Sequence, residues 1–74
     1  MRGQLADSRA RMTQLLQAAG ADGAGPQALA EQLQAEGHDT VRQTVAAWLT
    51  DLVDTGHAVR VRRGVYVHRD HHSP

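Results

Sequence analysis

The sequence predicts an α+β domain in which three helices are followed by a C-terminal β-hairpin. Apolar residues recur at helical spacing through three segments, and each of these segments ends at a glycine. Two short runs rich in alternating valine then flank residues 62–64, Arg-Arg-Gly. With 74 residues, of which 41% are hydrophobic, the chain can form one small domain with a thin core.

Composition narrows the classes of protein that the chain can represent. There is no cysteine, so disulfides and thiolate metal sites are excluded. No apolar run is long enough to cross a bilayer, and we expect a cytoplasmic protein without a membrane partner. All eight basic residues are arginine and eight acidic residues balance them. Any binding of nucleic acid must therefore depend on where the arginines are placed.

The segment from residue 39 to 56 is predicted to be the central helix of the domain. Thr40 is expected to cap its N-terminus, with Gln43 reaching back as in a capping box, and Gly56 is expected to end it. At ~100° per residue, its apolar side chains gather into one stripe that must be buried. The stripe consists of Val41, Val45, Trp48, Leu49, Leu52 and Val53. We expect Trp48 to be the central residue of the core.

The first predicted helix follows a flexible start at residues 1–6. Asp7 or Ser8 is expected to cap this helix, which runs to about Ala19 and stops at Gly20. Its apolar side is formed by Leu5, Met12, Leu15, Leu16 and Ala19. These residues repeat at helical spacing, so they indicate one face turned toward the core.

A second helix is predicted after a glycine-rich segment. Residues 20–25 read as a flexible connector, since they lack the Lys-Ser/Thr of a phosphate-binding loop and the spacing of a dinucleotide fingerprint. Pro26 suits the first helical position, so the helix is expected to run from Pro26 to Glu36. Its inward residues are Leu29 and Leu33. Only residues 37–39 then precede the central helix, and such a tight glycine-containing turn is typical of a helix-turn-helix unit.

The hairpin register follows from which side chains must share a face. A three-residue loop at residues 62–64, with Gly64 in the left-handed conformation, keeps every valine on one face. The expected pairs are Val61 with Val65 and Val59 with Val67. This register places Arg60 and Tyr66 on the outer side and the two loop arginines at the tip. Residues 69–74 are expected to be a flexible polar tail.

This order of elements resembles the winged helix-turn-helix DNA-binding domains of bacterial regulators. The resemblance covers residues 7–68, and the runs that carry it are Thr-Val-Arg, Leu-Val-Asp-Thr-Gly-His and Arg-Gly-Val-Tyr-Val. It implies that the third helix is the recognition helix and that the hairpin is the wing. The residues that it places toward duplex DNA are Thr40, Arg42, Gln43, Ala46, Ala47, Thr50, Arg60, Arg62, Arg63 and Tyr66.

The side-chain chemistry is compatible with such a role. Arg42 can donate two hydrogen bonds to guanine, and Gln43 can pair with adenine. The alternative is that both side chains simply lie in solvent at the end of a helix. Arg62 and Arg63 are suited to phosphate contacts, although such a pair also protects a sheet edge and aids solubility. Tyr66 can contact the sugar-phosphate backbone or merely cover a neighbouring side chain. The resemblance therefore implies sequence-recognising binding of duplex DNA, in a transcription regulator or in a DNA-maintenance factor.

A second function stays open beside DNA binding. The neutral total charge, together with Asp51 and Asp54 near the end of the third helix, favours a winged helix that serves as a protein-protein interaction module. A homodimer or a larger assembly is compatible with either function. We expect no enzyme activity, because no carboxylate pair or nucleophile-histidine pair falls in an expected cleft. We also expect no cofactor, no small-molecule substrate and no metal, since His71 and His72 lie in the predicted tail and His68 directly precedes it.

Overall fold

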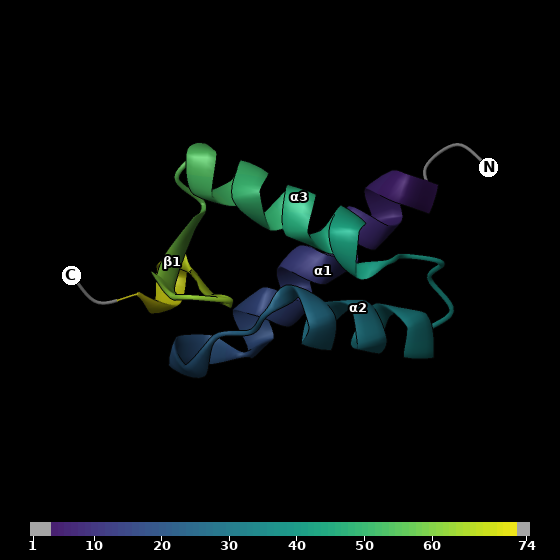
Figure 1. Ribbon diagram of the computed structural model, residues 1–74, viewed down its shortest axis with the longest axis horizontal. Coiled ribbons are helices and arrows are strands. Elements are labelled where there is room, and N and C mark those ends of the chain that lie inside the picture. Colours follow the sequence, from purple (N-terminus) through teal and green to yellow (C-terminus); the bar gives the residue numbers. More distant parts are fainter. Residues whose placement is uncertain (1–3, 73–74) are drawn as a thin grey trace.

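The computed structural model describes residues 4–72 and confirms the predicted α+β class and order of elements. The elements are α1 Gln4–Ala18, η1 Gly20–Asp22, α2 Pro26–Ala35, α3 Arg42–Asp54, β1 Ala58–Arg62, β2 Val65–His68 and η2 Arg69–His71. In Figure 1, α3 runs back above α2, α1 is seen between them, and the hairpin closes the end at which α3 finishes. Within the described range, no helix is long and apolar enough to cross a membrane.

A single core lies between the helices and one side of the hairpin. Its buried members are Met12, Leu16, Leu29, Ala30, Leu33, Val45, Leu49, Leu52 and Ala58. The inward leucines of α2 and the Met12 and Leu16 positions of α1 are as the periodicity predicted. Trp48 differs, because it is half-buried at the margin of this core and Leu49 is fully buried in its place. The expectation of Trp48 as the central core residue is therefore wrong.

The start of α3 also differs from the prediction. The helix begins at Arg42, and Val41 occupies the cap position without any side-chain capping bond. Thr40 lies in the turn before it with 4% of its surface exposed, and its carbonyl accepts a hydrogen bond of 2.8 Å from the side-chain amide of Gln34. Residues 36–41 thus connect α2 to α3, twice the length expected. Because Val41 precedes the helical phase, it is 53% exposed and not part of the buried stripe.

The C-terminal end of α3 follows the prediction. Gly56 has a φ of 82°, and its N–H donates to the carbonyl of Val53 at 3.1 Å. The N–H of His57 donates to the carbonyl of Leu52 at 2.8 Å, which completes a Schellman motif. Only glycine adopts this left-handed conformation without a Cβ penalty, so Gly56 fixes where the chain leaves the helix toward β1.

The first helix begins earlier than the cap pattern indicated. It already includes Gln4, so neither Asp7 nor Ser8 caps it, and Ser8 lies inside the helix with 3% of its surface exposed. The Oγ of Ser8 is 2.8 Å from Nδ1 of His38, in the turn between α2 and α3. A buried hydroxyl needs such a partner, and this contact fastens α1 to that turn. Residues 1–3 and the side chain of Leu5 lie outside the described part of the chain.

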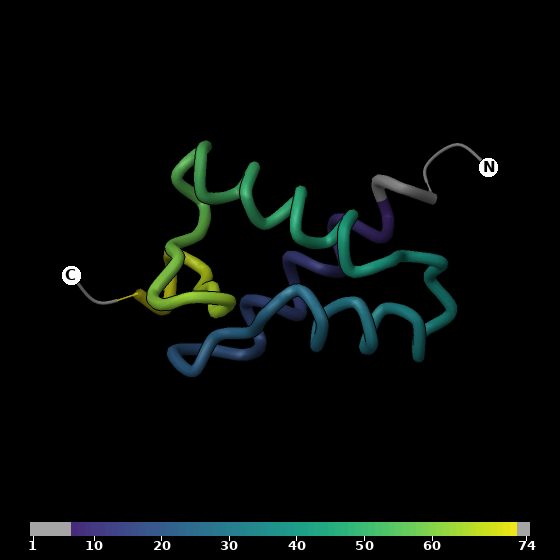
Figure 2. Tube along the Cα trace, in the orientation of Figure 1, coloured from purple at the N-terminus to yellow at the C-terminus, as the bar shows by residue number. Residues whose placement is uncertain are grey.

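The glycine-rich segment is an ordered part of the fold, and its prediction as a flexible connector is wrong. After η1, Ala24 forms an antiparallel bridge with Tyr66, in which each backbone N–H donates to the other residue's carbonyl at 2.9 Å. The trace in Figure 2 shows this segment passing beside the hairpin. A Cβ on Gly23 would lie 2.5 Å from the carbonyl oxygen of Tyr66, and a Cβ on Gly25 2.4 Å from that of Gly64. These glycines therefore allow two backbones to approach closely.

The hairpin register is partly as predicted. Val59 pairs with Val67, and Gly64 has a φ of 75° as the turn requires. The expected pair of Val61 with Val65 is wrong, because Arg62 lies opposite Val65 and the register shifts between Arg60 and Arg62. A β-bulge absorbs the extra residue inside β1, which leaves Val61 44% exposed.

Both faces of the hairpin are covered in part. Ala58 and Tyr66 pack against the helical core, so the prediction that Tyr66 points outward is wrong. Val67 is buried on the other face, where the chain passes at Gly23. The segment at Gly23 therefore covers part of the face that carries Val65 and Val67.

The residues after β2 include the short helix η2. The N–H of Arg69 donates to the carbonyl of His57 at 3.0 Å, and the Gln17 side chain donates to Oδ2 of Asp70 at 3.1 Å. His68 is buried, and its Nδ1 accepts from the N–H of Asp70 at 3.2 Å. Among the described residues, no cluster of three or more ligating side chains could hold a metal ion.

Candidate nucleic-acid interface

The outer face of α3 is the first part of the candidate interface. Gln43 and Ala47 are exposed and lie on the opposite side of the helix from the buried Val45 and Leu49, as helical spacing requires. Ala46 is half-buried, at the edge of this face. Between Gln43 and Thr50 this face is small and uncharged and has one amide, so another macromolecule could approach its backbone closely there.

A shallow cleft joins this face to the hairpin. Its lining consists of Thr50, Val53, Arg60 and Tyr66, and its volume is about 120 Å³. Three residues that the sequence assigned to the DNA side therefore meet in one place, although they come from α3, β1 and β2. Thr40 is the exception among the candidates, because it is buried in the turn before α3 and cannot reach a ligand there.

Exposed arginines stand at the two ends of this surface. Arg42 opens α3, and at ~1.5 Å of rise per residue it lies ~12 Å along the helix from Thr50. Arg62 and Arg63 are exposed at the tip of the hairpin. Within the described part of the chain, none of these three side chains forms an ion pair, and neither does Arg60.

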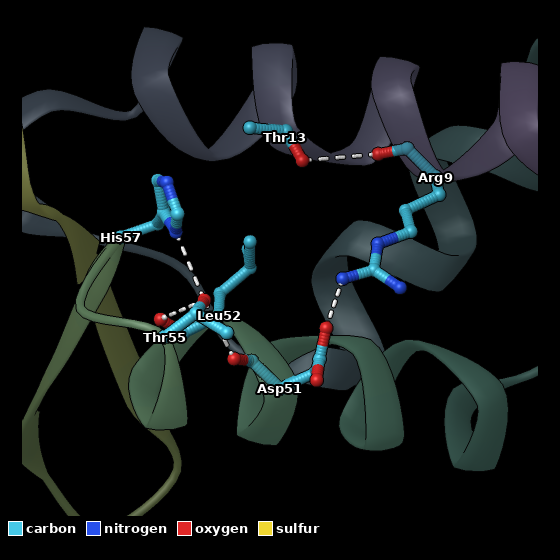
Figure 3. A network of polar contacts seen from close by, with 6 residues as sticks. All are labelled: Arg9, Thr13, Asp51, Leu52, Thr55 and His57. Carbon is cyan, nitrogen blue, oxygen red and sulfur yellow. Dashed lines mark hydrogen bonds and ion pairs between the residues drawn. The ribbon is translucent and has the colours of Figure 1, made fainter.

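The arginines of α1 are engaged by acidic side chains. Figure 3 shows Arg9 reaching from α1 to the carboxylate of Asp51 on α3. Arg11 holds Glu36 with two hydrogen bonds, from Nε to Oε1 at 2.7 Å and from Nη2 to Oε2 at 2.9 Å. The bond from Arg11 lowers the pKa of Glu36, and the carboxylate in turn raises the pKa of Arg11. The total charge is zero, but positive and negative side chains are thus unevenly distributed over the surface.

Two threonine hydroxyl groups, one within α3 and one on the residue that follows it, bond to carbonyls of the helix. Oγ1 of Thr50 donates to the carbonyl of Ala46 at 3.0 Å. Oγ1 of Thr55 donates to the carbonyl of Asp51 at 2.9 Å and also contacts Nδ1 of His57, as Figure 3 shows. Near the cleft, the hydroxyl proton of Thr50 is therefore already used within the helix.

Sequence reasoning missed the contacts that join distant segments. Ser8 meets His38 across 30 residues, and Arg9 meets Asp51 across 42. No local signal marks such pairs. The serine-histidine contact is not arranged for catalysis, because Ser8 is buried and offers a substrate no access.

A second hollow lies away from α3. It has a volume of about 310 Å³, between the end of α1, the segment at Gly23 and Ala24, and α2. Its remaining lining residues are Leu15, Ala18, Ala19, Ala28 and Gln32. None of the described residues that line this hollow is an acid, a base or a nucleophile.

The architecture is winged-helix-like: three helices and a C-terminal antiparallel hairpin that packs on them. No family model matches the chain, and neither a curated protein nor a solved structure is found to match it. Since a fold hosts many functions, the function has to be argued from the surface itself.

Proposed function

We propose that this domain binds duplex DNA, with α3 in the major groove and the hairpin as a wing along the sugar-phosphate backbone. The observation that carries the proposal is the distribution of charge. Arg9 and Arg11 of α1 are held by carboxylates, whereas the arginines beside the outer face of α3 and on the hairpin form no ion pair with any residue that the structure describes. Unpaired arginines are the side chains that bind phosphate oxygens, and they position a protein on a duplex.

The face between these arginines has the size and chemistry that a groove requires. A major groove is wide enough to admit a helix, and small side chains such as Ala46 and Ala47 let the helix enter deeply. Gln43 can donate to and accept from the edge of adenine, and Arg42 can donate to guanine. The activity is recognition without catalysis and without a cofactor.

One observation favours a second candidate, a protein-protein interaction module. Asp54 is exposed, and it lies three turns from Gln43 on the same outer side of α3. Its carboxylate would repel phosphate but would suit a basic partner surface. Under the DNA proposal, Asp54 must lie at the margin of the groove, at the end of the helix away from the bases.

The wing supplies the test of this proposal. The double variant Arg62→Ala/Arg63→Ala should bind every duplex more weakly, because side chains at a wing tip meet phosphates and not bases. Loss of two phosphate contacts should make the slope of log affinity against log salt shallower by roughly 2 units. The measurement is fluorescence anisotropy of a labelled mixed-sequence duplex over a series of salt concentrations.

A matched control removes the same charge elsewhere. The double variant Arg11→Ala/Arg69→Ala also lacks two arginines, but neither residue belongs to the outer face of α3 or to the wing. Its salt slope should equal that of the parent domain. Equal slopes for all three proteins would exclude the wing from a DNA interface, and absence of duplex binding by the parent would favour the protein-interaction module.

A further inference from the structure

Between Gln43 and Thr50, one turn before the exposed Asp54, the outer face of α3 presents methyl groups more than hydrogen-bonding groups. The hydroxyl of Thr50 donates to the carbonyl of Ala46 at 3.0 Å, so its proton is committed within the helix. Ala46 and Ala47 have only a Cβ to present, and both are accessible at least in part. Gln43 is the one amide on the face. A surface of this kind discriminates by apolar contact rather than by a set of donors and acceptors.

In the major groove of DNA, one base has a methyl group of its own. Thymine displays a C5-methyl there, and alanine or threonine methyl groups make apolar contact with it. We propose that α3 selects A·T pairs, with the methyl groups of Thr50 and Ala47 packing on thymine C5-methyl groups while Gln43 reads adenine. This inference rests on the proposed function, because it specifies which duplexes the same surface prefers.

Arg60, in the cleft beside Thr50, can fix the position of the contact between the Thr50 methyl and thymine. Arg60 lines the cleft together with Thr50, and its guanidinium forms no ion pair within the described residues. A backbone phosphate held by Arg60 keeps the C-terminal half of α3 at one depth in the groove. The methyl of Thr50 then meets one base step, instead of sliding over several.

The test removes the thymine methyl alone. A preferred duplex is first selected from a random library, and each thymine in it is then replaced in turn by deoxyuridine, which has the same hydrogen-bonding edge. Burying one methyl group is worth about a fourfold change in affinity. We expect the dissociation constant to rise about threefold to fivefold at the contacted thymines and to stay unchanged at the others.

Two substitutions at Thr50 separate the methyl from the hydroxyl. The quantity compared is the dissociation constant of the uracil duplex divided by that of the thymine duplex. Thr50→Val keeps a methyl, so this ratio should stay as in the parent domain. Thr50→Ser keeps the bond to Ala46 but lacks the methyl, so the ratio should fall to about one at one position. Ala47→Gly should lose it at another position, while the control Ala10→Gly, at an exposed alanine of α1, should keep it. Each ratio compares two duplexes on one variant, so it is independent of the variant's stability.

The outcomes distinguish this inference from the proposed function. If selection returns no preferred site or a site of G·C pairs, or if Thr50→Ser keeps the ratio and Thr50→Val loses it, selection by methyl contact is overturned while duplex binding stands. If the parent domain binds no duplex at all, the proposed function is overturned and this inference with it.

Discussion

Replacing Gly23 by alanine should destabilise the domain by roughly 2–6 kcal/mol, the sum of the penalty for a backbone conformation that essentially only glycine adopts and an overpacking penalty. Gly23 has a φ of 74°, and a Cβ there would lie 2.5 Å from the carbonyl oxygen of Tyr66 and 2.9 Å from a methyl of Val67. A domain of this length has a total stability of roughly 4–11 kcal/mol. The loss should be visible as a large fall in the thermal midpoint, followed by circular dichroism.

Substitutions at two other glycines measure the backbone penalty and the steric penalty separately. Gly20 has a φ of 63° and nothing within 4 Å of a Cβ, so Gly20→Ala should cost only the backbone penalty of about 1–2 kcal/mol. Gly25 has an ordinary φ of −110°, but a Cβ there would lie 2.4 Å from the carbonyl oxygen of Gly64. Gly25→Ala should therefore act by sterics alone. If Gly23→Ala were no worse than Gly20→Ala, the glycine-rich segment would not be packed against the hairpin.

The second large effect concerns the core. Leu49→Ala should lower the free energy of unfolding by ~2–5 kcal/mol, because Leu49 is a fully buried member of the core cluster. Trp48→Ala should cost less, about 2 kcal/mol, since only part of the indole is removed from water. Urea unfolding followed by circular dichroism gives both values, and it suits a protein whose one tryptophan is being replaced.

The order of these two values tests the phase of α3. With Trp48 at the centre of the core, its truncation would be the more damaging of the two. If Trp48→Ala lowered the free energy of unfolding more than Leu49→Ala does, α3 would have to be turned about its axis relative to the orientation described above. Gln43 and Ala47 would then no longer face outward together.

Local signals in the sequence were sufficient for the order of the elements and for most of their ends. The helical spacing of Leu29 and Leu33, and the left-handed stops at Gly37 and Gly56, each depend on a few neighbouring residues. Thr40 shows the limit of such signals. It has the chemistry of a cap, but the turn before α3 buries it and bonds its carbonyl to Gln34.

Contacts between distant segments could not be predicted in this way. Glycine-rich composition describes a flexible connector and a close approach of two backbones equally well, and only the bridge between Ala24 and Tyr66 distinguishes them. The same bridge holds Gly23 next to the buried Val67, while Tyr66 packs against the helical core. The exposure of the α3 face was predictable, whereas the pairing of Arg9 with Asp51 was not.

The most direct test of DNA binding is a titration of the ¹⁵N-labelled domain with mixed-sequence duplex DNA, followed by the backbone amide shifts. We expect the shifts to change at Gln43, Ala47 and Thr50 and at the wing tip around Arg62, with little change along the exposed side of α1. Shifts that stay still on α3 and the wing, or that move only around the hollow between α1 and α2, would contradict the proposal that this surface binds DNA.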